Sequence, residues 1–190
     1  SAASDVYKRQ GIATAHMDSI PMIVISGQVS RQYVGSDAFQ EADATGITRP
    51  ICKHNFLIND RESIADTFRK AFIIATTGRP GPVIIDIPKD LTDPNVKIDF
   101  EYKKNIKIRS YKIKTNEDDN KIEEAAKILC SAKKPMIYSG GGVILSKASK
   151  ELIKLTKLLN YPITNTLMGL GAYPSSDDQF LGMLGMHGTY

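Results

Sequence analysis

The sequence contains no tryptophan and only two cysteines among its 190 residues. Because Cys52 and Cys130 lie far apart and form no C-x-x-C motif, neither a disulfide framework nor a zinc site is expected, and a reducing cytoplasm is the predicted location. No apolar run approaches the roughly 18 residues of a membrane span, and the N-terminus has no hydrophobic signal core. We therefore expect neither membrane binding nor export.

The composition otherwise suits a folded globular protein. Hydrophobic residues make up 42% and charged residues 24% of the chain, and the formal net charge is +4. Much of the positive excess lies between Lys97 and Lys114, where seven Lys or Arg occur. This basic run lacks a regular pattern of stacking aromatics, so a solvated linker is favoured over a nucleic-acid-binding segment.

The first ten residues, SAASDVYKRQ, fit neither a helical nor a strand pattern. The string DVYKRQ can be read as the translated end of a sequencing adapter. We therefore expect residues 1–10 to be a non-native leader, with Gly11 as the first genuine residue and more of the natural protein upstream.

Two blocks of alternating strand and helix follow. The first has expected strands over 21–26, 53–58 and 82–88 and a helix over 61–77, which Asn59 and Asp60 can cap and Gly78 ends. The apolar runs PMIVIS and PVIIDIP are typical of parallel strands covered on both faces. The second has expected helices over 120–132 and 146–160, strands over 135–139 and 161–166, and a turn at 140–142. This order predicts an α/β fold with parallel sheets.

Polar and glycine residues follow the predicted strands, where ligands collect in open parallel sheets. They are Gln28, Lys89, Asp90, the triplet Gly140 to Gly142, Asn165 and Thr166. The triplet lacks the third glycine of G-x-G-x-x-G, so a turn without a ligand stays open as an alternative. Arg79 lies in a rigid turn, TGRPGP, and could bind a phosphate or satisfy helix carbonyls. Lys89 could equally be a solvated surface lysine.

The segment from Asn165 to Tyr190 has five glycines and three methionines, which suits either a flat cofactor or a tight turn with buried methionine. His16, His54 and His187 have no metal-ligand spacing, and no catalytic triad, carboxylate pair or P-loop can be assembled. Residue chemistry alone thus stops at a cofactor-binding α/β protein.

Longer strings resemble the catalytic subunits of the acetolactate synthase (acetohydroxyacid synthase) family, which depend on thiamine diphosphate. They are GIATAHMDSIPMIVISGQV, GSDAFQEAD, GRPGPVIIDIPKD, YSGGGV, NTLMGLGAYP and FLGMLGMHGTY, in the family's order from Gly11 to Tyr190. The resemblance implies part of a three-layer pyrimidine-binding domain (11–95), a linker (96–119) and part of a Rossmann-like central FAD-binding domain (120–190). An internal fragment, inactive by itself, is therefore expected.

The resemblance also implies roles for individual residues. Gln40 falls near thiamine diphosphate, and the substrate channel is lined by Ser30, Phe39 and Lys89. The implied FAD contacts are Arg79, Gly140, Gly141, Gly142, Thr166, Leu167, Met168, Leu184, Gly185, Met186 and His187. No catalytic residue and no metal ligand is expected within the chain, because the activating glutamate lies upstream and the Mg²⁺ and diphosphate ligands lie downstream. Ser30 departs from the proline common at its position, where substitution is associated with herbicide tolerance.

The implied reaction, a transfer of a two-carbon unit, decarboxylates pyruvate and condenses the unit with a second pyruvate or with 2-ketobutyrate. The products are 2-acetolactate or 2-aceto-2-hydroxybutyrate, which lead to valine and isoleucine. A homodimer or tetramer of catalytic subunits and a small regulatory subunit are implied as partners, with no nucleic acid or membrane. The alternatives are another FAD-containing thiamine enzyme, such as glyoxylate carboligase or pyruvate oxidase, and a non-catalytic nucleotide-binding module.

Overall fold

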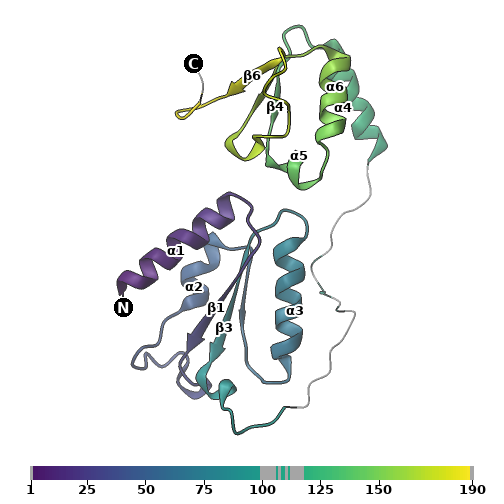
Figure 1. Ribbon diagram of the computed structural model, residues 1–190. Helices are drawn as coiled ribbons and strands as arrows, with labels where there is room; N and C mark the ends of the chain where they lie inside the picture. Colours follow the sequence, from purple (N-terminus) through teal and green to yellow (C-terminus); the bar gives the residue numbers. More distant parts are fainter. Residues whose placement is uncertain (1, 99–105, 107, 110, 112–117, 189–190) are drawn as a thin grey trace. The chain divides into compact units, whose positions relative to one another are not determined.

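The computed structural model describes residues 2–98, 106, 108, 109, 111 and 118–188, and the side chains from residue 8 onward (Figure 1). The chain divides into two compact units, Ser1–Thr115 and Asn116–Tyr190, which are described separately below. Much of the predicted linker, and most of the basic run between Lys97 and Lys114, lies outside the described residues.

The first unit is built on a parallel sheet of three strands. In the order β1-β3-β2 these are Met22–Gln28, Pro82–Pro88 and His54–Leu57, with Met22 paired to Pro82 and His54 to Val83. The three predicted strands are therefore confirmed, with shifts of one or two residues at their ends. The central strand β3 is buried on both faces, as its apolar sequence PVIIDIP predicts.

Helices cover both faces of this sheet (Figure 1). Helix α3 (Ser63–Thr76) packs Ala71, Ile74 and Ala75 against Val83 and Ile85 of β3. On the opposite face lie α1 (Ala2–Met17) and α2 (Ala44–Thr48), where Ile12 contacts Cys52 and Ile84. Three short 3₁₀ helices, η1 (Arg31–Tyr33), η2 (Arg49–Ile51) and η3 (Lys89–Thr92), complete the three-layer unit.

Local chemistry explains the boundaries of α3. The N-cap residue Glu62 makes no side-chain capping bond, but the backbone N–H of Ser63, the first helical residue, donates to Asp60 Oδ1 at 2.7 Å. Past the C-terminus, Gly78 has a φ of +60°, a left-handed conformation that glycine adopts without steric cost. The Nζ atom of Lys53 donates to the carbonyls of Ile74 and Thr77, a stabilising contact at the helix end that the sequence pattern does not indicate.

One expectation for the first unit is wrong, and two of its helical segments were not predicted. Strand β1 is not covered on both faces: it forms an edge of the described sheet, and Ile25 is 58% exposed. Residues 2–10 belong to α1 although their sequence shows no helical pattern. The short helix α2 was also not predicted, and it begins where Asp43 Oδ1 accepts from the N–H of Gly46 at 2.7 Å.

The second unit has a parallel sheet in the order β4-β5-β6. Its strands are β4 (Ile137–Ser139), β5 (Ile163–Asn165) and β6 (Phe180–Met183), and its helices are α4 (Asp119–Ser131), α5 (Gly141–Leu145), α6 (Ser149–Leu159) and the 3₁₀ helix η4 (Leu167–Gly169). Helices α4 and α6 lie along the same side of the sheet (Figure 1). The predicted helices over 120–132 and 146–160 and strands over 135–139 and 161–166 are confirmed.

Two features of the second unit differ from expectation. Gly141 and Gly142 begin helix α5 instead of forming a turn, and Gly140 is its N-terminal flanking residue in extended conformation. Strand β6 was not predicted, because it contains Gly182 at a φ of +84° and pairs with β5 through a register shift. A glycine in a strand interior weakens the sequence signal for a strand.

Candidate functional site

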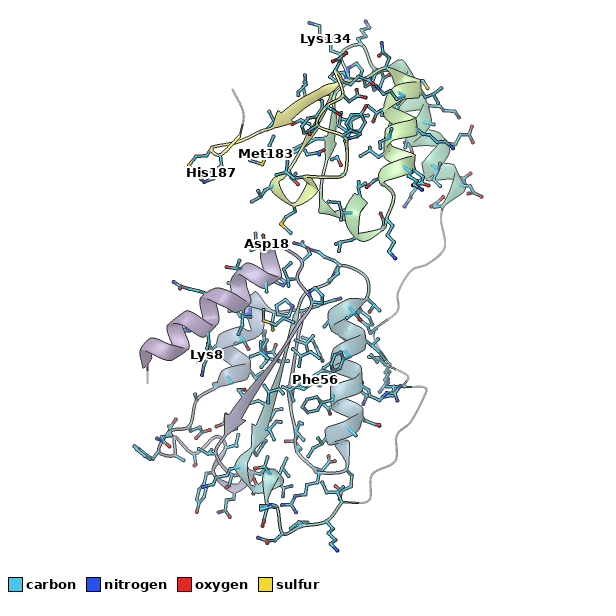
Figure 2. The ribbon with its side chains drawn as sticks, viewed as in Figure 1. Lys8, Asp18, Phe56, Lys134, Met183 and His187 are labelled. Atoms are coloured by element: carbon cyan, nitrogen blue, oxygen red, sulfur yellow. The ribbon has the colours of Figure 1, made fainter. Side chains whose placement is uncertain are left out.

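Three short segments of the second unit meet at one edge of its sheet. Gly140, Gly141 and Gly142 follow β4, Thr166, Leu167 and Met168 follow β5, and Leu184, Gly185, Met186 and His187 follow β6. Because the three strands are adjacent and parallel, their carboxyl ends lie at the same edge. The end of β6, with Met183 and His187, is labelled in Figure 2. The structure thus places the predicted cofactor residues of this unit after strand ends at one edge of the sheet.

The first two segments are packed backbone to backbone. A Cβ added at Gly169 would lie 2.5 Å from the carbonyl oxygen of Ser139, and one added at Gly141 would lie 3.0 Å from that of Met168. The N–H of Thr166 donates to the Ser139 carbonyl at 2.9 Å. By contrast, a Cβ at Gly142 would meet nothing within 4 Å. Gly141 and Gly169 therefore serve loop packing, while Gly142 leaves open space beside the edge.

Apolar side chains of the same edge are exposed. Leu167, Met168 and Leu184 are all more than a third accessible, and Met186 is 91% exposed. The alternative of a turn with buried methionine therefore fails for Met168 and Met186. An exposed group of leucine and methionine side chains beside glycine backbone is the kind of surface that binds a flat apolar ring.

Beneath this edge lie two buried polar side chains, Ser139 and Asn165, which are paired in the β4–β5 register. Among the described residues, Ser139 Oγ and both polar atoms of the Asn165 amide lack a hydrogen-bond partner. Asn165 is 0% exposed, so in this conformation its amide is enclosed and does not contact a ligand at the edge. The sequence pattern points to Asn165 but not to Ser139, which ends a strand without any distinguishing motif.

At the carboxyl edge of the first unit, one arginine links all three strands. The Arg31 backbone N–H and Nε donate to the two carboxylate oxygens of Asp90 at 2.9 and 2.7 Å, and Nη1 donates to the Asn59 carbonyl at 2.7 Å. These hydrogen bonds hold the pKa of Asp90 below its usual range, with the backbone bond as the largest cause. Asp90 was noted in the sequence, but Arg31 was missed.

The predicted substrate-channel and thiamine residues lie around the same edge. Ser30 precedes η1 with φ −57° and ψ 144°, and Lys89 is exposed at the start of η3. Phe39 is 90% exposed, and Gln40 next to it has a φ of +67°. The exposure of Lys89 is consistent both with a lysine that lines a substrate channel and with a solvated surface lysine.

Arg79 lies in the first unit, whereas the other predicted FAD contacts lie in the second. Its Nε donates to Ser19 Oγ at 2.8 Å and its Nη2 to the Met17 carbonyl at 3.0 Å. The guanidinium thus binds the C-terminal end of α1, which is the helix-carbonyl contact that the sequence allows as the alternative to a phosphate site. It remains exposed in the described structure.

Within the described residues, no three His, Cys, Asp or Glu side chains form a group able to hold a metal ion. None of the described helices is both long and apolar enough to cross a bilayer.

Comparison with known proteins identifies clear relatives. Residues 122–190 match the family described as "Thiamine pyrophosphate enzyme, central domain". The acetolactate synthase large subunit of Haemophilus influenzae is 54% identical over 179 residues, which are 94% of this chain and 31% of that protein. The isozyme 3 large subunit of Escherichia coli is 48% identical over 95% of this chain and 31% of its own length. The chain therefore spans about a third of the curated relatives that it matches.

A solved structure shares the fold. It is a protein from Mycobacterium smegmatis described as a thiamin diphosphate-dependent enzyme, with a TM-score of 0.76 and 23% identity, covering 98% of this chain and 35% of that one. At this level of identity the likeness concerns the fold alone. It supports the parallel α/β architecture described above.

Proposed function

We propose that the complete protein is an acetolactate synthase. The premise is that this chain is homologous to acetolactate synthase large subunits over 94% of its length. The complete protein would condense two molecules of pyruvate, or pyruvate and 2-ketobutyrate, with loss of CO₂. The observation that carries the proposal is that about half of the residues are identical to those of subunits of that name, over nearly the whole chain. Thiamine diphosphate, when bound, supplies the carbanion chemistry.

For the second unit we propose FAD as the ligand of the carboxyl edge. Support comes from the open space at Gly142 and from the exposed side chains of Leu167, Met168 and Leu184, which offer an apolar surface to a flat ring. The edge offers no Asp or Glu in these segments, which suits a structural role of the flavin. Arg79 is proposed as a further FAD contact on the family resemblance alone.

For the first unit we propose the pyrimidine side of the thiamine site. Gln40 would lie near the cofactor, and Ser30, Phe39 and Lys89 would line the approach of the ketoacid. The exposed phenyl ring of Phe39 offers an apolar wall, and the exposed ammonium of Lys89 can attract a carboxylate substrate. Mg²⁺ would be held by residues outside this sequence.

The domain assignment and assembly are also proposals. Residues 11–95 would form part of a pyrimidine-binding domain, 96–119 a linker and 120–190 part of a central FAD-binding domain. Two or four catalytic subunits would assemble with a small regulatory subunit, which the name "large subunit" of the relatives suggests.

Product analysis of the complete protein tests the activity. With thiamine diphosphate, FAD and Mg²⁺ present, we expect 2-acetolactate from pyruvate. Tartronate semialdehyde from glyoxylate, or acetyl phosphate from pyruvate, would identify one of the related flavin enzymes instead. Absence of all three products would favour a non-catalytic nucleotide-binding module.

A further inference from the structure

The loop between Gly35 and Ala42, which carries Phe39 and Gln40, is closed by the carboxylate of Glu41. One oxygen, Oε1, accepts from the backbone N–H of Gly35, and the other, Oε2, accepts from the N–H of Ala38 at 3.1 Å. The Glu41 N–H in turn donates to the Ala38 carbonyl at 2.9 Å. Both carboxylate oxygens are therefore used inside the loop, and they fix the chain on either side of Asp37.

This closure holds a backbone shape that the sequence does not favour. Gly35 has a φ of +85°, Asp37 of +55° and Gln40 of +67°. For residues with a Cβ, such left-handed conformations cost about 1–2 kcal/mol each, and they persist where surrounding contacts impose them. The hydrogen bonds to Glu41 are contacts of this kind, because charge-assisted bonds from backbone N–H groups are stronger than neutral ones.

A second contact ties the end of the loop to the centre of the sheet. Gln28, the last residue of β1, donates from Nε2 to the Ala42 carbonyl at 2.7 Å and to Asp86 Oδ2 at 3.0 Å. Asp86 belongs to the central strand β3, is 2% exposed, and also accepts from Ser26 Oγ at 2.6 Å. The Gln28 amide thus connects the loop to a buried carboxylate that neighbouring strands hold in place.

We propose that Glu41 and Gln28 are positioning residues that hold the 35–42 loop in a preformed shape, so that Phe39 stands exposed and Gln40 keeps its left-handed backbone for binding. The part of this inference that concerns binding rests on the proposed function, in which Gln40 lies near thiamine diphosphate and Phe39 lines the substrate channel. The part that concerns loop shape rests on the hydrogen bonds alone. A preformed loop binds its ligand without the entropic cost of ordering.

Hydrogen exchange of the full chain tests the shape of the loop. In Glu41→Gln, one acceptor oxygen is replaced by an NH₂ group, so we expect exchange within 35–38 to become about tenfold faster. Gln28→Met, which keeps the length of the side chain and removes both donors, should raise exchange around Ala42. Glu124→Gln, an exposed change of the same chemistry on α4, is the matched control and should alter neither region. Unchanged exchange within α3 verifies that the first unit is folded.

Binding measurements on the complete protein test positioning. In Glu41→Gln we expect the dissociation constant of thiamine diphosphate and the KM for pyruvate to rise severalfold, while the FAD absorbance stays that of the unaltered protein. Unchanged exchange in 35–38, or faster exchange with unchanged thiamine binding and KM, overturns the inference. If the unaltered complete protein forms no acetolactate, the proposed function fails, and the exchange experiment still decides whether Glu41 shapes the loop.

Discussion

At the residue scale, the glycines at the edge of the second sheet have different physical roles. Gly169 packs its Cα against backbone atoms of Ser139 and Gly140, whereas Gly142 faces open space. The sequence does not distinguish these two glycines, and only their neighbours in the fold do. This difference can be measured without any ligand.

We predict that Gly169→Ala lowers the free energy of unfolding by about 2 kcal/mol or more, because its Cβ would lie 2.5 Å from a backbone oxygen that cannot move independently. Gly142→Ala, the matched control within the same edge, should change it by less than about 0.5 kcal/mol. Chemical denaturation followed by circular dichroism measures both. Equal losses for the two variants would contradict the packing described here.

Ser30 provides a second prediction at this scale. Its φ of −57° lies within the range that the proline ring imposes, and its side chain makes no capping hydrogen bond. Ser30→Pro should therefore be tolerated and should stabilise the chain by about 0.4–1 kcal/mol through the unfolded state. Thermal unfolding measures this change.

In the complete protein, we expect the Ser30→Pro variant to be inhibited by sulfonylureas more strongly than the unaltered protein, if the proposed activity holds. The expectation follows from the family resemblance at this position. Equal inhibition of the two proteins would show that Ser30 does not affect sensitivity to sulfonylureas.

At the element scale, Arg31 joins the ends of β1, β2 and β3 through Asp90 and Asn59. The lowered pKa of Asp90 means that its carboxylate stabilises the fold at a pH above the unfolded value of about 3.9. This contribution is lost as the pH falls through the folded pKa. Lowering the pH should therefore weaken the Arg31–Asp90 contact at this edge of the sheet before it weakens contacts between uncharged groups.

We predict that Arg31→Gln raises the pKa of Asp90 but leaves it below its ordinary value, because the backbone N–H of residue 31 still donates to the carboxylate. Titration of the Asp90 carboxyl carbon by NMR measures the change, with the exposed Arg49→Gln as control. A return of the pKa to its ordinary value would show that the side chain alone lowers it.

The apolar periodicity of individual elements predicted most helices and strands but not how well they are covered. Helix α4 forms over nearly the predicted range, yet Ile122 and Ile128 are exposed in the described structure. Strand β1 is similarly apolar and only half covered. Periodicity identifies which side chains share a face, whereas burial depends on whether another element packs there.

At the scale of the whole molecule, large apolar side chains are exposed in both units. Phe39 and Met17 in the first unit and Leu158 and Met186 in the second are all more than two thirds accessible. The chain also covers only about a third of its curated relatives, in which these residues have further sequence around them.

We predict that the isolated 190-residue chain binds the dye ANS with a several-fold rise in fluorescence and associates in a concentration-dependent way. The complete protein should bind the dye more weakly at the same concentration, because its further residues and cofactors would cover these side chains. Fluorescence titration and size-exclusion chromatography measure them. Dye binding by the complete protein equal to that of the isolated chain would contradict this explanation.

The sequence by itself determined the parallel α/β fold, the bounds of most elements and, through whole motifs such as DAFQE and LGMLGMHG, the family resemblance. Local patterns suffice for these because apolar spacing, capping residues and glycine act within a few residues. Only the tertiary structure decided that three separate segments containing glycine, methionine and leucine share one edge, and that Gly141 is packed while Gly142 faces open space. It also decided that Arg31, Glu41 and Gln28 hold the loops by hydrogen bonds. Most of those contacts join residues that are far apart in the sequence and become neighbours only through the order of the strands, so no local pattern predicts them.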